Sequence, residues 1–528
     1  MHPKRSMQNR LFIWSLTAAL AGFLFGFDTV VISGAEKTIQ SLWQLSPGTH
    51  GWAMSMALWG TVLGSMIGGF PTDRLGRKST LLWIGVLYFV SAIWSAAATD
   101  VYSFMIARFI GGVGVGISTV AAPLYISEIS PSGQRGWMAG MFQFNIVFGI
   151  LVALVSNALI SGLGENAWRW MLGVEAIPAI LYTLFCFGLP KSPRWLIAVK
   201  KDRLTAEKIL TQINPESDQA KVSSMADEIE QSAPQEDASN GKFWSSQLRK
   251  PIALAFLIAF FNQLSGINII LYFAPRLLGL AGFEDPFTAA IGLGLVNLVF
   301  TFVGLWLIDK LGRKSLLLIG SIGYILSLGV CGWAFLTNDD FKVVSNAQNV
   351  IDAAGVVSML DSVDYREVSD SEKANARAAL GKASVELAKD SDASGARNGV
   401  AEIVTVAEEV KAAASKRLGS SSYLVLGCLL AFIASHAVGQ GAVIWVFISE
   451  IFPNSHRAAG QAFGCFTHWI LAALLTLLFP IVIANVDAGW LFVFFCFMMC
   501  LQLLWVVTMV PETKGVPLEK IQKMLGLN

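Results

Sequence analysis

The sequence contains few charged residues and almost no net charge. Charged side chains make up 14% of the 528 residues, and 38 Lys and Arg nearly balance 37 Asp and Glu to leave a net charge of +1. Soluble domains carry roughly 25% charged residues, whereas 54% of this chain is hydrophobic. The composition therefore excludes an ordinary soluble domain, and the near-zero charge provides no basic surface for a nucleic acid.

Cysteine and histidine are scarce as well. The chain has 6 Cys and 5 His, and the cysteines lie in apolar stretches without a Cys-x-x-Cys pair or a histidine at metal-site spacing. We therefore expect no metal and no cofactor. The sequence also shows no nucleophile–base pair and no nucleotide-binding loop, and so we expect a protein that is not an enzyme.

Long apolar segments, by contrast, are abundant. A membrane-spanning helix needs about 20 predominantly apolar residues. Twelve segments meet this requirement: residues 11–34, 52–71, 80–98, 101–126, 138–162, 168–190, 251–280, 287–308, 315–336, 422–450, 458–485 and 488–511. The sequence therefore predicts an all-α membrane protein with twelve transmembrane helices in a lipid bilayer. A cleaved signal peptide is the alternative for the first segment, but that segment is long and lacks a clear cleavage site.

Basic residues are concentrated in the loops on one side of these segments. An even number of spans places both termini on the same side, where Lys4, Arg77 and Lys314 also lie, whereas Lys37 is nearly alone on the other side. The positive-inside rule then predicts that both termini are cytoplasmic. We expect the protein to lie in the cytoplasmic (inner) membrane.

Two motifs occur once in each half of the chain. The string DRLGRK at 73–78 recurs as DKLGRK at 309–314, and the Ser-Glu-Ile-x-Pro-x-x-x-Arg string at 127–135 recurs at 449–457. Two independent motifs that repeat in the same order indicate an internal duplication.

The duplication divides the chain into domains. We predict an N-terminal six-helix bundle at 1–190, a partly helical cytoplasmic linker at 191–250 and a C-terminal six-helix bundle at 251–528. The second half is the longer one, and its excess falls at 337–421 on the non-cytoplasmic side. This segment is rich in Ala, Glu and Lys, so that we expect a helical cap or hairpin. Two interpretations of this segment are open: an insertion tolerated at the tip of a loop, or a cap that binds a partner.

Three ionisable residues lie within the predicted spans. Asp28, Arg108 and Glu175 are each seven residues from the outer end of their span, which places them at the same depth of roughly 10 Å. A buried carboxyl group can either pair with an arginine, which favours its ionised form, or bind a proton, which burial favours. A group that alternates between these two states has the properties of a proton-coupling site. A static ion pair that holds the helices in register is the alternative.

The repeated motifs place charges at the cytoplasmic ends of the spans. We expect Arg and Lys of one loop to pair with Glu of a neighbouring span end and to latch the two halves shut on the inner side. Topological anchoring by positive charge is the alternative, although it does not require the same pattern twice. The predicted cytoplasmic gate residues are Asp73, Arg74, Arg77, Glu128, Arg135, Arg194, Asp309, Lys310, Arg313, Glu450 and Arg457.

Uncharged polar residues form a second group within the spans. A buried amide without a hydrogen-bond partner is energetically costly. For a single Asn or Gln, a hydrogen bond to a neighbouring helix is the simplest explanation of its place in a span. A cluster within two helical turns, as at 262–268, instead favours a polar ligand. Amides offer donors and acceptors to a neutral polyol, and an indole packs on a sugar ring. The predicted substrate-binding residues are Gln143, Asn262, Gln263, Asn268, Asn297, Trp445, His468 and Trp469.

Taken together and in order, these strings resemble the sugar porter family of the major facilitator superfamily, and especially bacterial xylose–proton symporters. The resemblance covers nearly the whole chain. It rests on GFDT at 26–29, both Gly-Arg-Lys loops, Arg108-x-x-x-Gly112, PKSPRW at 190–195, FNQLSGIN at 261–268 and PETKG at 511–515.

The resemblance implies a major facilitator fold in which two bundles rock around a central site by alternating access. It further implies that a sugar contacts Gln143, Gln263, Asn268, Asn297, Trp445 and Trp469. The proton-coupled members resemble this chain at Asp28, Arg108 and Glu175, whereas passive members lack the acid at Asp28. That acid favours proton symport.

Four positions depart from the family pattern. Asn262 replaces a Gln, which could enlarge the pocket, and His468 replaces an Asn or Gln, which adds a titratable ring. Ala442 replaces a proline in the tenth span, so that we expect this helix to break less easily. Lys191 replaces a Glu, and we expect a weaker inner latch in the first half.

We therefore predict a proton-coupled importer of a neutral pentose or hexose that acts as a monomer, with a monosaccharide and a proton as its partners. A passive sugar uniporter of the same fold is the first alternative. A sugar-sensing receptor that signals through the insertion at 337–421 is the second. An inositol would fit the polar cluster as well as a sugar does.

Overall fold

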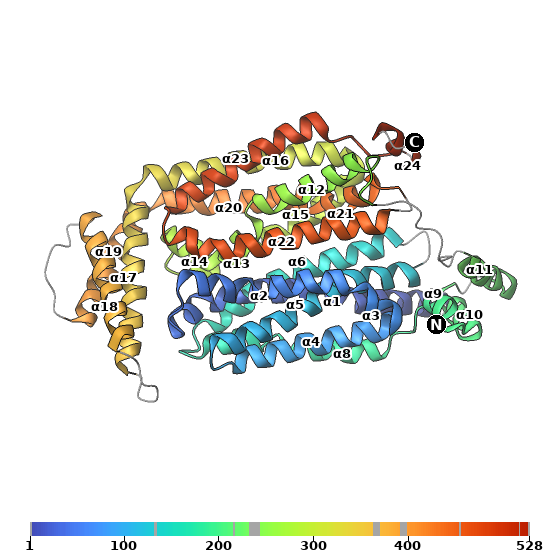
Figure 1. Cartoon of the computed structure of the whole chain (residues 1–528), viewed down its shortest axis with the longest axis horizontal. Helices are drawn as coiled ribbons and strands as arrows, with labels where there is room; N and C mark the ends of the chain where they lie inside the picture. Colours follow the sequence, from blue (N-terminus) through green and yellow to red (C-terminus); the bar gives the residue numbers. More distant parts are fainter. Residues whose placement is uncertain are drawn as a thin grey trace.

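The computed structural model describes residues 3–130, 135–214, 217–231, 243–362, 370–390, 399–453, 456–516 and 518–525. The regular structure in these ranges is helical, and no strand occurs there. Long helices lie side by side in one elongated bundle (Figure 1). Both termini lie at the same end of this bundle, which we term the terminal end. The helices labelled α17 (Asp339–Ser362), α18 (Asp370–Asp390) and α19 (Val400–Leu418) project from the opposite end, the cap end (Figure 1).

The chain forms its helices in three groups. The first is α1 (Pro3–Leu42), α2 (Pro47–Ile67), α3 (Gly69–Arg74), α4 (Arg77–Ala97), α5 (Val101–Ile129), α6 (Arg135–Ile160), α7 (Ala167–Gly173) and α8 (Ala176–Phe187). The second is α9 (Pro193–Trp195), the π-helical η1 (Leu196–Lys200), α10 (Arg203–Ile213) and α11 (Gln219–Gln231). The third is α12 (Arg249–Leu264), α13 (Ile267–Tyr272), α14 (Ala274–Leu280), α15 (Pro286–Leu311), α16 (Arg313–Thr337), α17 (Asp339–Ser362), α18 (Asp370–Asp390), α19 (Val400–Leu418), α20 (Ser420–Val438), α21 (Gln440–Ile451), α22 (Arg457–Ile483), α23 (Ala488–Met509) and α24 (Leu518–Met524).

Twelve helical spans account for the bundle. Eleven segments of the described chain are long and apolar enough to cross a membrane. The remaining predicted span, at 52–71, corresponds to α2, whose histidine, serines and glycines lower its hydropathy. This helix has 21 residues, about the length that a bilayer requires, and it packs along α5 and α22. The prediction of twelve transmembrane helices is confirmed.

The seventh span is interrupted between α12 and α13. Gly266 adopts a φ of +87°, which a residue with a side chain rarely does. The ring of Phe495 also occupies the space in which a β-carbon at this position would lie. Both constraints require glycine, and the break redirects the helix in the middle of the bundle.

The tenth span is also interrupted, in contrast to our expectation. Ala442 in place of proline was expected to make this helix less easily broken, yet α20 ends at Val438 and α21 begins at Gln440. The expectation is wrong because the break lies at Gly439, three residues earlier. Gly439 packs directly against Gly320 of α16, and this close approach of two backbones needs no proline.

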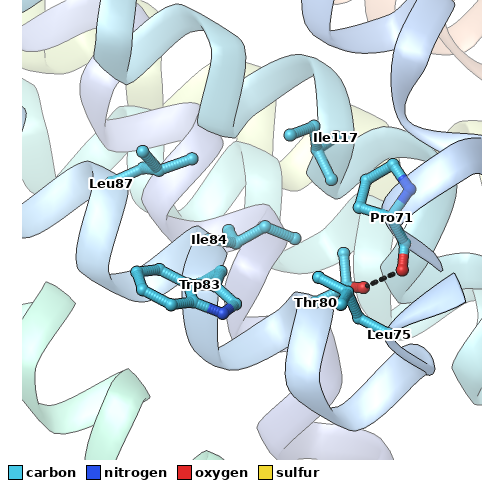
Figure 2. Close-up of a pocket in the computed structure, with 7 residues that line it drawn as sticks. All are labelled: Pro71, Leu75, Thr80, Trp83, Ile84, Leu87 and Ile117. Carbon is cyan, nitrogen blue, oxygen red and sulfur yellow. Dashed lines mark hydrogen bonds between the residues drawn. The ribbon is translucent and has the colours of Figure 1, made fainter.

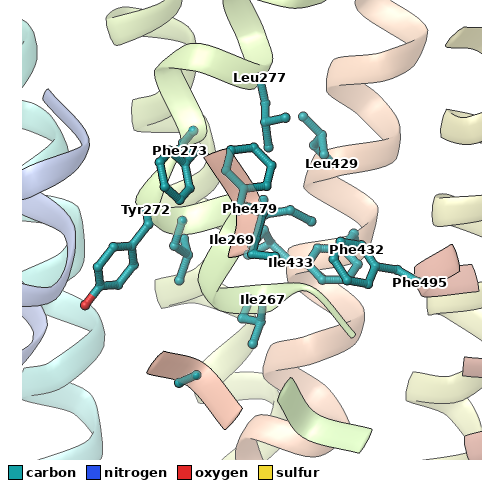
Figure 3. Packing of buried hydrophobic residues seen from close by; sticks show 14 of the residues in the cluster. Ile267, Ile269, Tyr272, Phe273, Leu277, Leu429, Phe432, Ile433, Phe479 and Phe495 are labelled. Carbon is teal, nitrogen blue, oxygen red and sulfur yellow. The ribbon is translucent and has the colours of Figure 1, made fainter. Parts of the chain in front are cut away.

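Small residues and aromatic rings pack the helices together. A methyl group added at Gly112 or Gly116 would overlap the backbone of α2, so that these glycines allow α5 and α2 to approach closely. In the second half, the rings of Phe273 and Phe479 lie 4.2 Å apart between centroids in a dense apolar cluster (Figure 3). The two halves meet where α2 packs on α22 and α6 packs on α15.

The insertion forms a cap of three helices, α17 to α19, at the end opposite the termini (Figure 1). Its helices α18 and α19 both pack on α17. Arg417 pairs with Asp340 at 2.6 Å, and Lys411 Nζ donates to Gln348 Oε1 at 2.7 Å. The cap also contacts the bundle, because α17 packs on both α1 and α14.

Candidate functional site

A charged cluster is buried among helices of the first half. Asp28 lies on α1, Arg108 on α5 and Glu175 between α7 and α8, and each is at most 2% exposed. Arg108 Nη1 donates to Asp28 Oδ1 at 2.5 Å, and Nη2 donates to the Asp28 backbone carbonyl at 3.0 Å. The structure thus brings together the three ionisable residues that the sequence placed at one depth.

Glu175 is incompletely paired in this cluster. It lies near enough to Asp28 and Arg108 to interact with both electrostatically, yet its Oε1 has no hydrogen-bond partner among the described residues. Within the part of the chain that the structure describes, the buried hydroxyl of Tyr88 also lacks a hydrogen-bond partner. A buried carboxylate oxygen without a donor is costly, and protonation removes that cost. The cluster can therefore hold a proton as well as an ion pair.

A chain of amide side chains is buried in the second half. On α12, Gln263 Nε2 donates to Asn262 Oδ1 at 3.1 Å and to the ring Nε2 of His468 at 3.0 Å. Asn268 Nδ2 donates to Gln263 Oε1 at 2.7 Å. Asn262 Nδ2 in turn donates to Gln440 Oε1 at 3.4 Å. These bonds connect α12, α13, α21 and α22 through polar groups alone.

The helix break explains how Asn268 reaches Gln263. Only residues three or four apart face each other along a continuous helix, and these two residues are five apart. Because α12 ends at Leu264 and α13 begins anew at Ile267, the side chain of Asn268 can turn back toward α12. The backbone conformation at Gly266 therefore assembles this part of the site.

Aromatic rings border the amide chain. The His468 ring centroid lies 5.1 Å from that of Trp445 and 4.7 Å from that of Trp469. Phe25 of α1 packs edge-on against Trp469, so that the first half covers this side of the site. Trp469 Nε1 is buried and forms no hydrogen bond with another described residue. Flat apolar rings beside several donors and acceptors can bind a sugar.

Two predicted binding residues stand apart from this chain. Asn297 is buried on α15, and Gln143 is half-buried on α6. No hydrogen bond between described residues joins either of them to the amides of α12. They lie on helices that pack against each other across the two halves.

Sequence reasoning missed two polar features of the second half. Gln440 is completely buried beside Asn262, and no described residue forms a hydrogen bond with its Nε2. The hydroxyl of Tyr324 and Nδ1 of His436 form a hydrogen bond of 2.7 Å. Gln440, Tyr324 and His436 could have been found from the sequence, because burying a polar group within a span is energetically costly.

The first-half gate residues form an ion cluster at the terminal end of the bundle. Arg77 Nη2 pairs with Glu128 at 3.0 Å and Nη1 with Asp73 at 3.1 Å. Ser192 Oγ donates to Glu128 Oε2 at 2.5 Å. Arg74 instead lies over the ring of Phe70, with 5.4 Å to the centroid.

The second half repeats this cluster. Arg313 Nη2 pairs with Glu450 at 2.8 Å and Nη1 with Asp309 at 3.4 Å. Thr513 Oγ1 donates to Glu450 Oε2 at 2.6 Å, in the place that Ser192 takes in the first half. Lys310 Nζ lies 3.5 Å from the ring centroid of Trp306. The sequence signal for both hydroxyls was Pro-x-(Ser/Thr), which occurs at 190–192 and 511–513.

The arrangement corrects part of the predicted latch. We expected the motifs to join the two halves, but each arginine pairs with a glutamate of its own half. Arg194 is exposed, and Nε and Nη2 of Arg457 have no hydrogen-bond partner in the described ranges, so that neither arginine joins these clusters there. The side chain of Arg135 lies outside the described residues.

Lys191, which replaces the Glu of the family pattern, leads to a prediction about the stability of the protein. Glu512 caps α16, because its carboxylate accepts from the backbone nitrogens of Arg313 at 3.0 Å and Lys314 at 3.1 Å. Lys191 takes the position in the Pro-x-(Ser/Thr) motif of the first half that Glu512 takes in the second, and it interacts electrostatically with Lys78 of α4. Its ammonium group cannot accept such bonds. We expect Lys191→Glu to raise the free energy of unfolding by about 1 kcal/mol, measured as a higher Tm in detergent. Lys208→Glu, on the exposed face of α10, is the control, and equal effects of the two variants would contradict the prediction.

A pocket at the terminal end lacks the chemistry of a sugar site. It is lined by apolar side chains of α3, α4 and α5 and by Thr80 (Figure 2). The Thr80 hydroxyl already donates to the Pro71 carbonyl at 3.0 Å. The lining offers no further side-chain donor or acceptor except the indole nitrogen of Trp83, so that the amide chain is the better candidate for binding a polar ligand.

Comparisons with known proteins agree with this architecture. The sequence model of the family described as "Sugar (and other) transporter" matches residues 14–357 and 399–525. The chain is 31% identical to the galactose-proton symporter of Escherichia coli (strain K12) over 99% of this chain and 96% of the relative. It is 30% identical to the arabinose-proton symporter of Bacillus subtilis (strain 168), with 97% and 94% covered.

A solved structure has the same fold. The inward-open conformation of the xylose transporter XylE from E. coli superimposes with a TM-score of 0.72 at 27% identity, over 97% of this chain and 99% of that chain. The match to the family model described above is interrupted at residues 358–398, which lie within the cap. The chain therefore belongs to the sugar porter family of the major facilitator superfamily and is a multi-pass membrane transporter, not an enzyme.

Proposed function

We propose that this protein imports a neutral monosaccharide, a pentose or hexose, together with a proton. The observation that carries the proposal is the buried Asp28–Arg108 pair, with the incompletely paired Glu175 beside it. The names of the galactose and arabinose relatives support symport with a proton. A purely structural ion pair would not require a second carboxyl group in the same cluster.

The amide chain on α12 and α13 is the proposed sugar site. Gln263 offers an amide that exchanges its present partners for sugar hydroxyls at little cost, since both states are hydrogen-bonded. Trp445 and Trp469 supply the apolar faces. A neutral substrate is favoured because no Lys or Arg takes part in the amide chain. Asn297 and Gln143 complete the proposed site from α15 and α6.

Proton binding and sugar binding communicate through α1 and α13. Tyr272 of α13 is buried and interacts electrostatically with Asp28, and the same short helix carries Asn268. Protonation of Asp28 releases Arg108 and favours opening toward the cap end. Sugar binding then closes that side, and proton loss at the other side resets the transporter. We propose that the terminal end faces the cytoplasm and that the ion clusters there regulate opening on that side.

Uptake into proteoliposomes tests this function. Labelled pentoses, hexoses and inositol are each offered with and without an inward proton gradient. We expect one sugar to accumulate only when the gradient is present, because the downhill proton drives the sugar uphill. Equilibration of that sugar regardless of the gradient would contradict symport and identify a passive transporter of the same fold. Accumulation of inositol would correct the substrate class.

A further inference from the structure

A second buried ion cluster lies at the cap end, away from the proposed proton and sugar sites. Glu36 of α1 contacts Nε2 of His50 on α2 through its Oε2 at 3.0 Å. Its Oε1 lies 3.3 Å from Nε of Arg276 on α14. Gln40, one turn further along α1, accepts a hydrogen bond from Nη2 of Arg276. We call these four residues the Glu36 cluster.

The cluster joins the two halves of the transporter. Glu36, Gln40 and His50 belong to α1 and α2 in the first half, whereas Arg276 belongs to α14 in the second. The terminal-end clusters differ, since each pairs residues of a single half. The first predicted span ended before Glu36, and only the continuation of α1 to Leu42 brings Glu36 and Gln40 to α14.

The charges of the cluster are withdrawn from water. Glu36 and His50 are at most 1% exposed, and the side chain of Arg276 is 12% exposed. A buried carboxylate is tolerated only where cationic or donor groups compensate for the loss of hydration. His50 belongs to the same half as Glu36, but Arg276 provides its part of that compensation only while α1 and α14 stay together. The cap helix α17 covers the same junction, since it packs on both.

We propose that the Glu36 cluster is a latch that holds the cap side of the transporter closed. Alternating access requires α1 and α14 to separate when that side opens. Separation breaks the Glu36–Arg276 contact and returns both charges to water, and closure rebuilds it. The proposal rests on alternating access by the proposed transporter, but it depends neither on proton coupling nor on the identity of the sugar.

The latch predicts a shift in conformation when one partner is removed. Glu36→Gln leaves the Arg276 charge buried without a counter-charge in the closed state, whereas in the open state water solvates it. We therefore expect the ratio of cap-open to cap-closed molecules to rise at least tenfold. Replacing both residues, as Glu36→Gln with Arg276→Gln, removes the buried unpaired charge and is expected to give a smaller shift than Glu36→Gln alone.

Spin-label distances in nanodiscs measure this ratio without requiring transport. Labels attached at Thr38→Cys and Glu284→Cys, both exposed at the cap end of opposite halves, report the separation of α1 and α14. The background replaces Cys500, which is exposed. Glu165→Gln, an exposed cap-end carboxylate, is the control and should leave the distances unchanged.

The outcomes separate a latch from a packing role. A wild-type distance distribution in well-folded Glu36→Gln, confirmed by an unchanged Tm, overturns the latch. If this variant does not fold, Glu36→Asp serves instead, because its shorter carboxylate keeps the charge and lies farther from Arg276. Wild-type distances in Glu36→Asp likewise overturn the proposal. A passive transporter would still show the predicted shift, so that failure of proton symport and failure of the latch remain distinguishable.

Discussion

Asp28→Asn is expected to abolish accumulation of sugar against its gradient while exchange of sugar across the membrane continues. For one proton per sugar, a proton gradient of one pH unit supports about tenfold accumulation at equilibrium. We expect this ratio to fall to one in the variant. Radiolabelled uptake and counterflow in proteoliposomes measure the two activities separately.

The physical reason lies in the buried charges around Arg108. Asparagine keeps a carbonyl oxygen that can accept from Arg108 but cannot release or bind a proton in the physiological range. The arginine does not lose every counter-charge, because Glu175 lies in the same cluster with an unpaired oxygen. The helices should therefore stay packed, and the loss should concern coupling and not folding.

Asp487→Asn provides the matched control for this prediction. Asp487 is exposed before α23 and makes no capping hydrogen bond, so that the same change of charge should leave accumulation intact. Gradient-driven accumulation by Asp28→Asn at the wild-type ratio would contradict the assignment of Asp28 as the coupling acid. It would make the Asp28–Arg108 pair a structural one.

Gln263→Leu is expected to weaken sugar binding about 100-fold, or roughly 3 kcal/mol. Gln263 donates to Asn262 and His468 and accepts from Asn268, so that it occupies the centre of the amide chain. Leucine has a similar size but can neither donate nor accept. The sugar would lose its bonds to this residue, and neighbouring amides would lose a partner. Isothermal titration with the transported sugar measures the change in Kd.

A second buried glutamine serves as the control. Gln502 of α23 is fully buried, and its Nε2 donates to Ser321 Oγ at 2.9 Å, away from the amide chain. Gln502→Leu should lower the Tm by removing a buried hydrogen bond yet leave Kd within about twofold of wild type. Equal Kd values for Gln263→Leu and the wild type would exclude Gln263 from the sugar site.

Part of the candidate site could be predicted from the sequence, and part could not. Asp28, Arg108 and Glu175 could be grouped from the sequence, because a charge within a spanning helix is rare and its depth follows from counting residues. The energetic cost of burying an amide within a span likewise identified Asn262 and Gln263. Counting did not reveal which amides bond to each other, since that depends on where a helix is interrupted and how its neighbours pack.

Corrections arose where a contact depends on partners far apart in the chain. The repeated motifs predicted ion pairs at Arg77 and Arg313 but not that each pair closes within its own half. Ala442 suggested an unbroken tenth span, yet the helix is interrupted at Gly439, where it packs against Gly320. In both cases the composition of a single segment carried no information about the helix that packs against it.

The sequence by itself determined the class of protein, the twelve spans and the internal duplication. The transfer of apolar side chains into a bilayer is a local property, which the sequence displays segment by segment. Only the tertiary structure decided that Asn268 turns back to Gln263 and that Glu36 meets Arg276. These contacts depend on helix breaks and on the packing of helices, because a buried polar group bonds to whichever partner the fold places beside it.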